Sequence, residues 1–197
     1  MIETRLNLVT APAATAISLA ECKAHSYIST TDDDAYVTAL VSAVTAVLDG
    51  PDGILGRALI TQTWDMYMDS LPAEYINVPL PPLQSVTSIK YLDVNGDQQT
   101  LASDQYSVNI YGSQGQIVPA YGVSWPSGRD DTNGVVVRFV CGYTTVPTNI
   151  TLAMKMLVAH YYENRELTSM SKDSVLLPMG FNALIGSYRV RETGSAK

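Results

Sequence analysis

Apolar residues near both ends of the chain are spaced for helices. Ser18 followed by Glu21 is a capping-box signature, which predicts a short helix over about Leu19 to Tyr27. Stripes with a period near 3.6 predict three further helices, from Asp34 to about Leu48, from Pro147 to about Glu166, and from Phe181 to Tyr188. The stripes consist of Val37, Leu40, Val41, Val44 and Leu48, then Ile150, Met154, Leu157 and Tyr161, then Phe181, Leu184, Ile185 and Tyr188.

Between these helices the apolar residues alternate as in β-strands. From Leu59 to Asp69 one face carries Ile60, Trp64, Met66 and Met68, and the other carries Thr61, Thr63, Asp65 and Tyr67. We expect this segment to be the first strand of a sheet. Further strands are predicted at Tyr75–Val78, Val86–Asp93, Gln98–Leu101, Tyr106–Ile110, Gln116–Val118 and Val135–Cys141.

The connections between these strands carry turn and proline signals. Asn95-Gly96 is expected to supply the positive φ values of a tight hairpin turn. Pro79, Pro81 and Pro82 are expected to hold their segment extended. Residues 1–16 are rich in Ala, Thr and Pro and are also expected to be extended.

The pattern predicts an α+β fold. Residues 18–49 and 147–188 are predicted to form a helical bundle. A small antiparallel β-sheet or sandwich, at about 58–143, is inserted between these two helical segments. We interpret 1–197 as a single domain with a mobile linker at Leu167–Met179 and a flexible C-terminal tail at 189–197.

The charge argues against a general nucleic-acid binder. The formal net charge is -7, and the 12 Lys and Arg residues are spread along the chain, whereas phosphate binding requires clustered cations. An acidic wall could instead let DNA slide past without sticking. Cys22 and Cys141 are interpreted as buried small apolar residues, which fits a reducing cytoplasm.

The apolar runs do not predict insertion into a membrane or export. No run of about 18 apolar residues occurs, so we expect no contact with a membrane. The first residues include Glu3 and Arg5, where a secretory signal would need a basic end followed by an apolar core.

Polar clusters in the chain do not form a recognisable catalytic or metal motif. Asp32, Asp33 and Asp34 are interpreted as anionic residues that complement a helix N-terminus. Arg129, Asp130 and Asp131 are interpreted as part of a solvated loop over residues 123–133. His160 shares a helix face with Glu163, three residues on, and with Asn164, four residues on, but the two ligands of either pair are too few for a metal site. We therefore predict no catalytic residue, no metal site and no cofactor.

Apolar segments at the periphery of the predicted fold favour a role in binding other chains over a role in catalysis. The run VLLPM at 175–179 and the stripe on the last helix are apolar, and the back face of the Asp34–Leu48 helix carries Thr, Ser and Ala. A small chain with such features is expected to bury them against other chains.

Ordered motifs give the chain a family resemblance. They are LNLVTAP (6–12), LAECKAH (19–25), GRALITQTW (56–64), PLPPLQSVTSIKYLDVNG (79–96), Tyr106 with GQIV (115–118), SWP (124–126), VRFVCGY (137–143), VP followed by a helix ending HYYENRE (160–166), and PMGFNALIGSYR (178–189). Together they resemble the head-tail connector (adaptor) proteins of long-tailed bacteriophages and gene transfer agents. The resemblance covers residues 6–189; only the turn at Asp49–Gly53 departs from it.

The resemblance implies a structural protein and not an enzyme. Family members form a ring under the portal at one vertex of the virion, where they extend the DNA channel and join head to tail. The implied partners are the portal protein, neighbouring copies in a ring with about as many copies as the dodecameric portal, a downstream stopper or tail-side protein, and DNA that passes without sequence-specific binding. Assembly would take place in the bacterial host cytoplasm.

The resemblance also suggests which residues bind partners. By position, the C-terminal segment would bind the portal through Phe181, Leu184, Ile185, Tyr188, Arg189 and Arg191. Tyr162, Glu163 and Arg165, at the end of the HYYENRE helix, are candidates for the contact between subunits. Deleting 179–197 is expected to leave a folded monomer and to give DNA-filled heads without tails.

Two other functions remain open at this point. One is a different virion binding module, such as a capsid-surface or tail-completion protein. The other is an uncharacterised hydrolase that uses the acidic loop with Asp130 and Asp131.

Overall fold

The chain forms two compact units, one built from helices and one from strands. The computed structural model describes residues 4–165 and 179–190. The β unit comprises Met1–Ala13 and Thr61–Tyr143, and the helical unit comprises Ala14–Ile60 and Thr144–Lys197. The predicted α+β class, with a β part inserted between helical segments, is confirmed. Whether 1–197 acts as a single domain stays a prediction.

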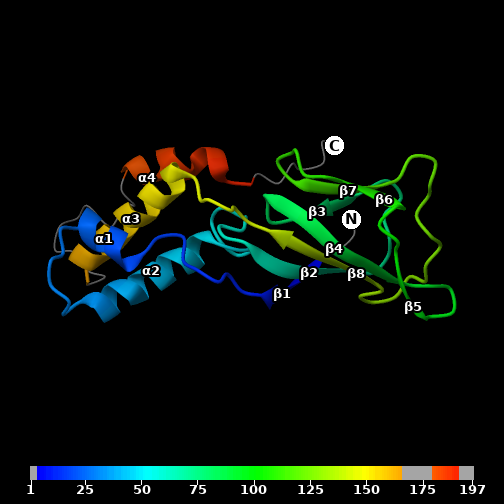
Figure 1. Cartoon of the computed structure of the whole chain (residues 1–197), viewed down its shortest axis with the longest axis horizontal. Coiled ribbons are helices and arrows are strands. Elements are labelled where there is room, and N and C mark those ends of the chain that lie inside the picture. Colours follow the sequence, from blue (N-terminus) through cyan, green and yellow to red (C-terminus); the bar gives the residue numbers. More distant parts are fainter. Residues whose placement is uncertain (1–3, 166–178, 191–197) are drawn as a thin grey trace. The chain divides into compact units, whose positions relative to one another are not determined.

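The helical unit is arranged around its third helix. Its elements are α1 (Leu19–His25), α2 (Asp34–Leu48), α3 (Thr148–Glu163), α4 (Met179–Ile185) and a 3-10 turn, η1 (Gly186–Tyr188). Helix α3 contacts α1, α2 and α4, as Figure 1 shows. The bounds of α2 are those predicted from its apolar stripe, and Val37, Val41, Val44 and Leu48 are buried, whereas Leu40 is half-buried.

The local signals for the first helix are confirmed in atomic detail. The Ser18 hydroxyl accepts a hydrogen bond from the Glu21 amide at 3.2 Å, and the Glu21 carboxylate accepts one from the Ser18 amide at 2.8 Å. Ile17 and Cys22 are both 1% exposed. Both cysteines are buried, as the sequence predicted.

The β unit contains two antiparallel sheets. The five-stranded sheet has the order β1-β2-β8-β4-β5, and the three-stranded sheet has the order β3-β7-β6. The strands are β1 (Arg5–Thr10), β2 (Gln62–Met68), β3 (Ile76–Val78), β4 (Leu83–Leu92), β5 (Gln98–Thr100), β6 (Tyr106–Asn109), β7 (Gly115–Pro119) and β8 (Val135–Cys141). Strand β8 has its predicted bounds and buries Val135, Val137, Phe139 and Cys141 on one face.

The two sheets approach each other closely at Gly115 on β7. A Cβ atom at this position would lie 2.3 Å from Leu83 Cδ2 and 2.7 Å from Leu83 Cβ. Gly115 and Leu83 are both buried. The absence of a side chain at residue 115 therefore allows β7 to pack against β4.

The prediction that Leu59–Asp69 forms the first strand is wrong, because β1 precedes it. Strand β1 pairs antiparallel with β2, from Arg5 opposite Tyr67 to Leu8 opposite Trp64. It lies at the edge of the sheet and its last four residues are exposed, so it shows no alternation of buried and exposed residues. Only its pairing with β2 identifies it as a strand.

The face assigned to Asp65 also needs correction. The alternation placed it among polar residues, yet Asp65 is 5% exposed. Its carboxylate accepts two hydrogen bonds from Arg138, at 2.8 Å from Nε and 2.7 Å from Nη2. The long Arg138 side chain, on the neighbouring strand β8, covers and neutralises the carboxylate. Ile60, expected on the buried face, is only half-buried and precedes β2.

Two connections differ from the turns expected. In the β4–β5 hairpin only Gly96 has a positive φ, of 90°, and its amide donates to the Asp93 carbonyl at 3.0 Å. The chain needs a left-handed residue only after the bend, so Asn95 keeps an ordinary conformation. The proline segment is not uniformly extended, because Leu80 has a φ of 59° and the Pro81-Pro82 bond is cis.

Candidate functional site

The end of α3 carries the residues predicted to contact another subunit. The Tyr162 hydroxyl donates a hydrogen bond to Asp33 Oδ2 at 2.6 Å, and Arg165 Nη2 donates to Asp33 Oδ1 at 3.2 Å. The Arg165 guanidinium also lies over the rings of Tyr36, at 4.5 Å, and Tyr162, at 5.2 Å. This cluster of Asp33, Tyr36, Tyr162 and Arg165 joins the start of α2 to the end of α3.

The hydrogen bonds of the cluster shift the pKa values of Asp33 and Tyr162. The Tyr162 hydroxyl, and after it Arg165, lower the pKa of Asp33 because both donate to its carboxylate. The same hydrogen bond raises the pKa of Tyr162, since deprotonation would remove the donor and place two negative charges together. Tyr162 and Arg165 thus already have partners within the chain, whereas Glu163 is exposed. Their role between subunits stays a prediction.

His160 lies two residues before Tyr162, in the last turn of α3. The Asn164 side-chain amide donates to the His160 carbonyl at 2.9 Å and lies 3.5 Å from His160 Nδ1. Within residues 4–165 and 179–190, no group of three or more His, Cys, Asp or Glu residues is placed to hold a metal ion. The helices within these two ranges lack the combination of length and hydropathy that a membrane span requires.

The residues predicted to bind the portal do not share one environment. Phe181 and Ile185 are fully buried, and α4 packs on α3. They are therefore core residues of the helical unit in this structure, contrary to the expectation that they present an open apolar stripe. Leu184 and Tyr188 are half-buried.

The arginines predicted to bind the portal lie at the end of the described chain. Arg189 is exposed, and its Nη2 donates to Asn182 Oδ1 at 3.1 Å. Arg191, the linker and the rest of the tail lie outside the described residues. The role in portal binding stays a prediction, and for Phe181 and Ile185 it requires α4 to leave α3.

The last described residues are attached to the turn that follows α2. The Val190 amide donates to the Leu55 carbonyl at 2.9 Å, and Arg57 Nε donates to the Tyr188 carbonyl at 2.6 Å. Gly56 has a φ of 61°, and a Cβ atom there would lie 3.4 Å from Val190 Cβ. This attachment fixes the point at which the tail leaves the helical unit. Sequence reasoning missed it because Asp49–Gly53 was interpreted only as a helix stop.

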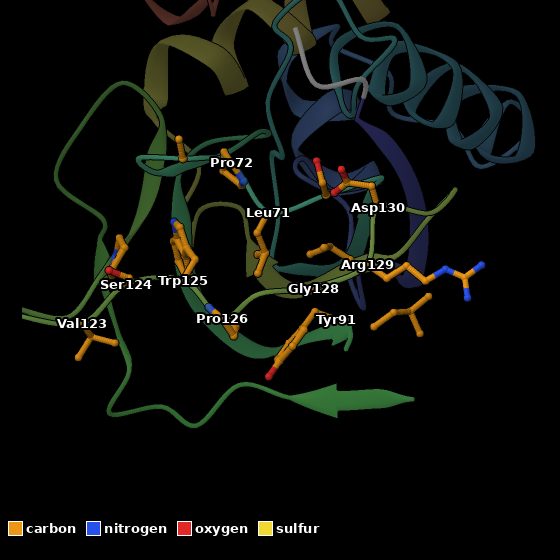
Figure 2. Close-up of a pocket in the computed structure, with 15 residues that line it drawn as sticks. Leu71, Pro72, Tyr91, Val123, Ser124, Trp125, Pro126, Gly128, Arg129 and Asp130 are labelled. Carbon is orange, nitrogen blue, oxygen red and sulfur yellow. The ribbon is translucent and has the colours of Figure 1, made fainter. Parts of the chain in front are cut away.

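The β unit contains a pocket of about 410 Å³ that sequence reasoning also missed. Figure 2 shows Leu71, Tyr91, Trp125 and Pro126 around this hollow. Apolar and polar groups both line it: Leu71, Pro72, Ala73, Tyr91, Leu92, Pro119, Val123, Trp125, Pro126 and Val135, with Ser70, Ser124, Gly128, Arg129 and Asp130. The loop over 123–133 was interpreted as solvated because its charges dominate the sequence, yet it contributes Trp125 to the wall.

The charged residues of the acidic loop are exposed. Arg129 and Asp131 form an ion pair at 3.3 Å, with side chains that are 56% and 44% exposed. Asp131 and Gly134 form a turn in which the Gly134 amide donates to the Asp131 carbonyl at 2.9 Å. Exposed charges of this kind are typical of a solvated loop.

Comparison with known proteins relates the chain to one family and one type of particle. A family model described as head completion protein matches residues 15–175. No curated protein matches the chain. Among solved structures, a chain in the neck of an empty GTA particle, computed with C6 symmetry, has a TM-score of 0.76 at 23% identity and covers 97% of this chain and 98% of its own.

Two further solved structures give the same result. A chain in the neck of a native GTA particle, computed with C12 symmetry, has a TM-score of 0.69 at 24% identity, with 97% and 98% of the two chains covered. A chain in the virion of a native gene transfer agent particle has a TM-score of 0.64 at 24% identity, with 96% and 98% covered. At these identities the likeness establishes a shared fold.

Proposed function

This chain belongs to the head completion protein family, and we propose that it is a structural component of the neck of a phage-like particle, where it joins the head to the tail. The match to the family model over most of the chain carries this proposal. The fold supports it, because it is shared over nearly the whole length with chains of GTA necks. The resemblance inferred from sequence to head-tail connector proteins is thereby confirmed at the level of the family.

We further propose that several copies form a ring under the portal. The similar neck structures were computed with C6 and C12 symmetry, which supports a repeated arrangement of copies around an axis. A heterologous contact that closes on itself produces such a ring. The portal and a tail-side protein would bind opposite faces of the ring, and DNA would pass through its centre.

The proposed role is assembly and not catalysis. The candidate residues make contacts that hold helices together, as in the cluster of Asp33, Tyr36, Tyr162 and Arg165. The net charge of -7 suits a protein beside passing DNA, because like charges prevent capture.

The structure allows a sharper truncation than deletion of 179–197. That deletion would remove the buried side chains of Phe181 and Ile185, so loss of function could result from unfolding. Ending the chain after Val190 keeps both residues and the Val190–Leu55 hydrogen bond. We predict that this truncated protein folds and that particles made with it are DNA-filled heads without tails, as counted by electron microscopy.

Two controls complete the truncation experiment. Thermal unfolding of the truncated protein should match that of the full chain, which shows that the fold is retained. A full-length protein supplied in the same cells should restore tails. Tailed particles made at normal yield in the absence of any copy of this protein would refute a role in joining head to tail.

A further inference from the structure

The dipeptide Asn-Gly occurs at two turns of the β unit, at Asn95-Gly96 and at Asn133-Gly134. Both asparagines are exposed. Both glycine amides donate to the carbonyl of the residue three positions earlier, at 3.0 Å in the first turn and 2.9 Å in the second. Because glycine has no side chain, nothing on it blocks the approach of its nitrogen to the preceding carboxamide. The two turns therefore contain the same pair of potentially reacting groups.

The two asparagine side chains differ in what holds them. The Asn133 side-chain oxygen accepts a hydrogen bond from Arg5 Nη1, and the Asn133 amide donates to Asp69 Oδ1 at 3.0 Å. Arg5 also forms an ion pair with Asp69 at 3.0 Å. The Asn95 side chain, in contrast, makes no hydrogen bond to any residue in the described ranges. Of the two side chains, only that of Asn133 must break a hydrogen bond before its carboxamide can rotate.

The strands beside the two glycines differ as well. Gly96 lies in the hairpin between β4 and β5, and β5 is an edge strand with three residue pairs. Gly134 is buried and directly precedes β8, which pairs with β2 on one side and β4 on the other. A short edge strand opens more readily than a central strand. The Gly96 amide is therefore released from its turn more often than the Gly134 amide.

We propose that Asn95 is a site of spontaneous deamidation, and that the hydrogen bond from Arg5 protects Asn133 from the same reaction. The Gly96 nitrogen loses its proton to solvent and attacks Asn95 Cγ, which forms a new N–Cγ bond. The bond between Cγ and the carboxamide nitrogen breaks, and this nitrogen takes up a proton from solvent and leaves as ammonia. The product is a five-membered succinimide ring.

Water then opens the succinimide ring in one of two ways. Cleavage of the new N–Cγ bond gives aspartate, and cleavage of the bond between the Gly96 nitrogen and the Asn95 carbonyl carbon gives isoaspartate. The whole reaction consumes one water molecule and releases one ammonia molecule, with no oxidation or reduction. Either product adds a negative charge to the hairpin, and isoaspartate also lengthens its backbone by one methylene group.

Mass spectrometry of peptides from the folded, full-length protein tests the proposal. The protein is incubated at mildly alkaline pH in heavy-oxygen water, so that opening of the ring labels the product. We expect deamidation at Asn95 to be about ten-fold faster than at Asn133, the factor that corresponds to one hydrogen bond of ordinary net strength. Equal rates at the two sites, or a faster rate at Asn133, would overturn the proposal.

Incubation in concentrated urea shows whether the folded structure causes the difference. In the unfolded chain neither carboxamide is held, so the deamidation rates at Asn95 and Asn133 should converge. A difference that persists undiminished in urea would place its cause in the flanking sequence and would overturn the proposal. This comparison needs no substitution, so it does not depend on the folding of a variant.

The variant Arg5→Met tests the protective contact directly. It removes the donor to the Asn133 side chain, so deamidation at Asn133 should become several-fold faster, while the rate at Asn95 in the same molecules stays unchanged. Thermal unfolding shows that the variant is folded under the conditions used. An unchanged rate at Asn133 in the folded variant would overturn protection by Arg5. The reaction requires only the turn and water, so these outcomes leave the proposed function at the neck unaffected.

Discussion

At the scale of single residues, the hydrogen bonds of Asp33 connect two helices that are far apart in sequence. Asp33 was predicted to complement a helix N-terminus, and it does occupy the N-cap of α2, but its side chain makes no capping hydrogen bond. It is instead the acceptor for Tyr162 and Arg165. A residue whose type suits a local role can thus be used for a distant contact when the fold provides donors.

We predict that Tyr162→Phe lowers the stability of the helical unit only at pH values at which the Asp33 carboxyl is ionised and the Tyr162 hydroxyl is protonated. Because folding lowers the pKa of Asp33, its ionised carboxylate stabilises the fold above pH 3.8, the pKa in the unfolded chain. This stabilisation is lost as the pH falls through the lower pKa of the folded state. Because folding raises the pKa of Tyr162, its protonated hydroxyl stabilises the fold below pH 10.0, the pKa in the unfolded chain. This stabilisation is lost as the pH rises through the higher pKa of the folded state.

Thermal unfolding of both proteins across pH checks this prediction. The difference in Tm between wild type and Tyr162→Phe should be largest near neutral pH and should shrink toward both extremes. Tyr27→Phe is a suitable control, because Tyr27 is 94% exposed. A difference that does not vary with pH would show that Tyr162 acts through packing alone.

At the scale of elements, the close approach of β7 to β4 depends on one glycine. A methyl group at residue 115 would overlap the Leu83 side chain, which is itself buried. We predict that Gly115→Ala destabilises the β unit by about 1–3 kcal/mol, the range typical of overpacking. Urea unfolding monitored by circular dichroism measures this change.

A second substitution shows whether the overlap is the cause. Leu83→Ala removes Cγ and Cδ2, two of the three Leu83 atoms that the new methyl group would meet, and keeps only Cβ, so the two substitutions together should cost less than the sum of their separate effects. If the two effects simply add, the destabilisation by Gly115→Ala does not come from contact with the Leu83 side chain beyond Cβ, and its cause lies elsewhere, for example in the backbone.

The last helix is both a candidate binding element and part of a core. Phe181→Ala would leave a cavity under α4, and we predict a loss of about 3–5 kcal/mol in unfolding free energy. Arg189→Ala, at an exposed position on the same segment, should change stability by less than about 0.5 kcal/mol. Equal stability of the two variants would show that α4 does not pack on α3 in solution.

At the scale of the whole molecule, acidity is a property that no single site explains. The net charge of -7 is distributed over both units and does not form one binding patch in the sequence. We predict no retention of double-stranded DNA at physiological salt in a filter-binding assay, even at tens of micromolar protein. Tight, salt-sensitive binding would contradict the proposed passage of DNA without capture.

Elements whose signals are local could be predicted from the sequence. The 3.6-residue stripe set the bounds of α2, the alternation set those of β8, and Ser18 with Glu21 set the start of α1, because each depends on neighbours a few residues apart. The order of motifs along the chain was also enough to identify the family.

Contacts between residues far apart in the chain became known only from the folded structure. Pairing with β2 made the exposed segment Arg5–Thr10 a strand, and Arg138 allowed Asp65 to be buried. Packing of α4 against α3 also buried Phe181, which the sequence placed only on an apolar stripe. Trp125 became part of a pocket because loops distant in sequence surround it. These outcomes depend on contacts between distant segments, which no local pattern contains.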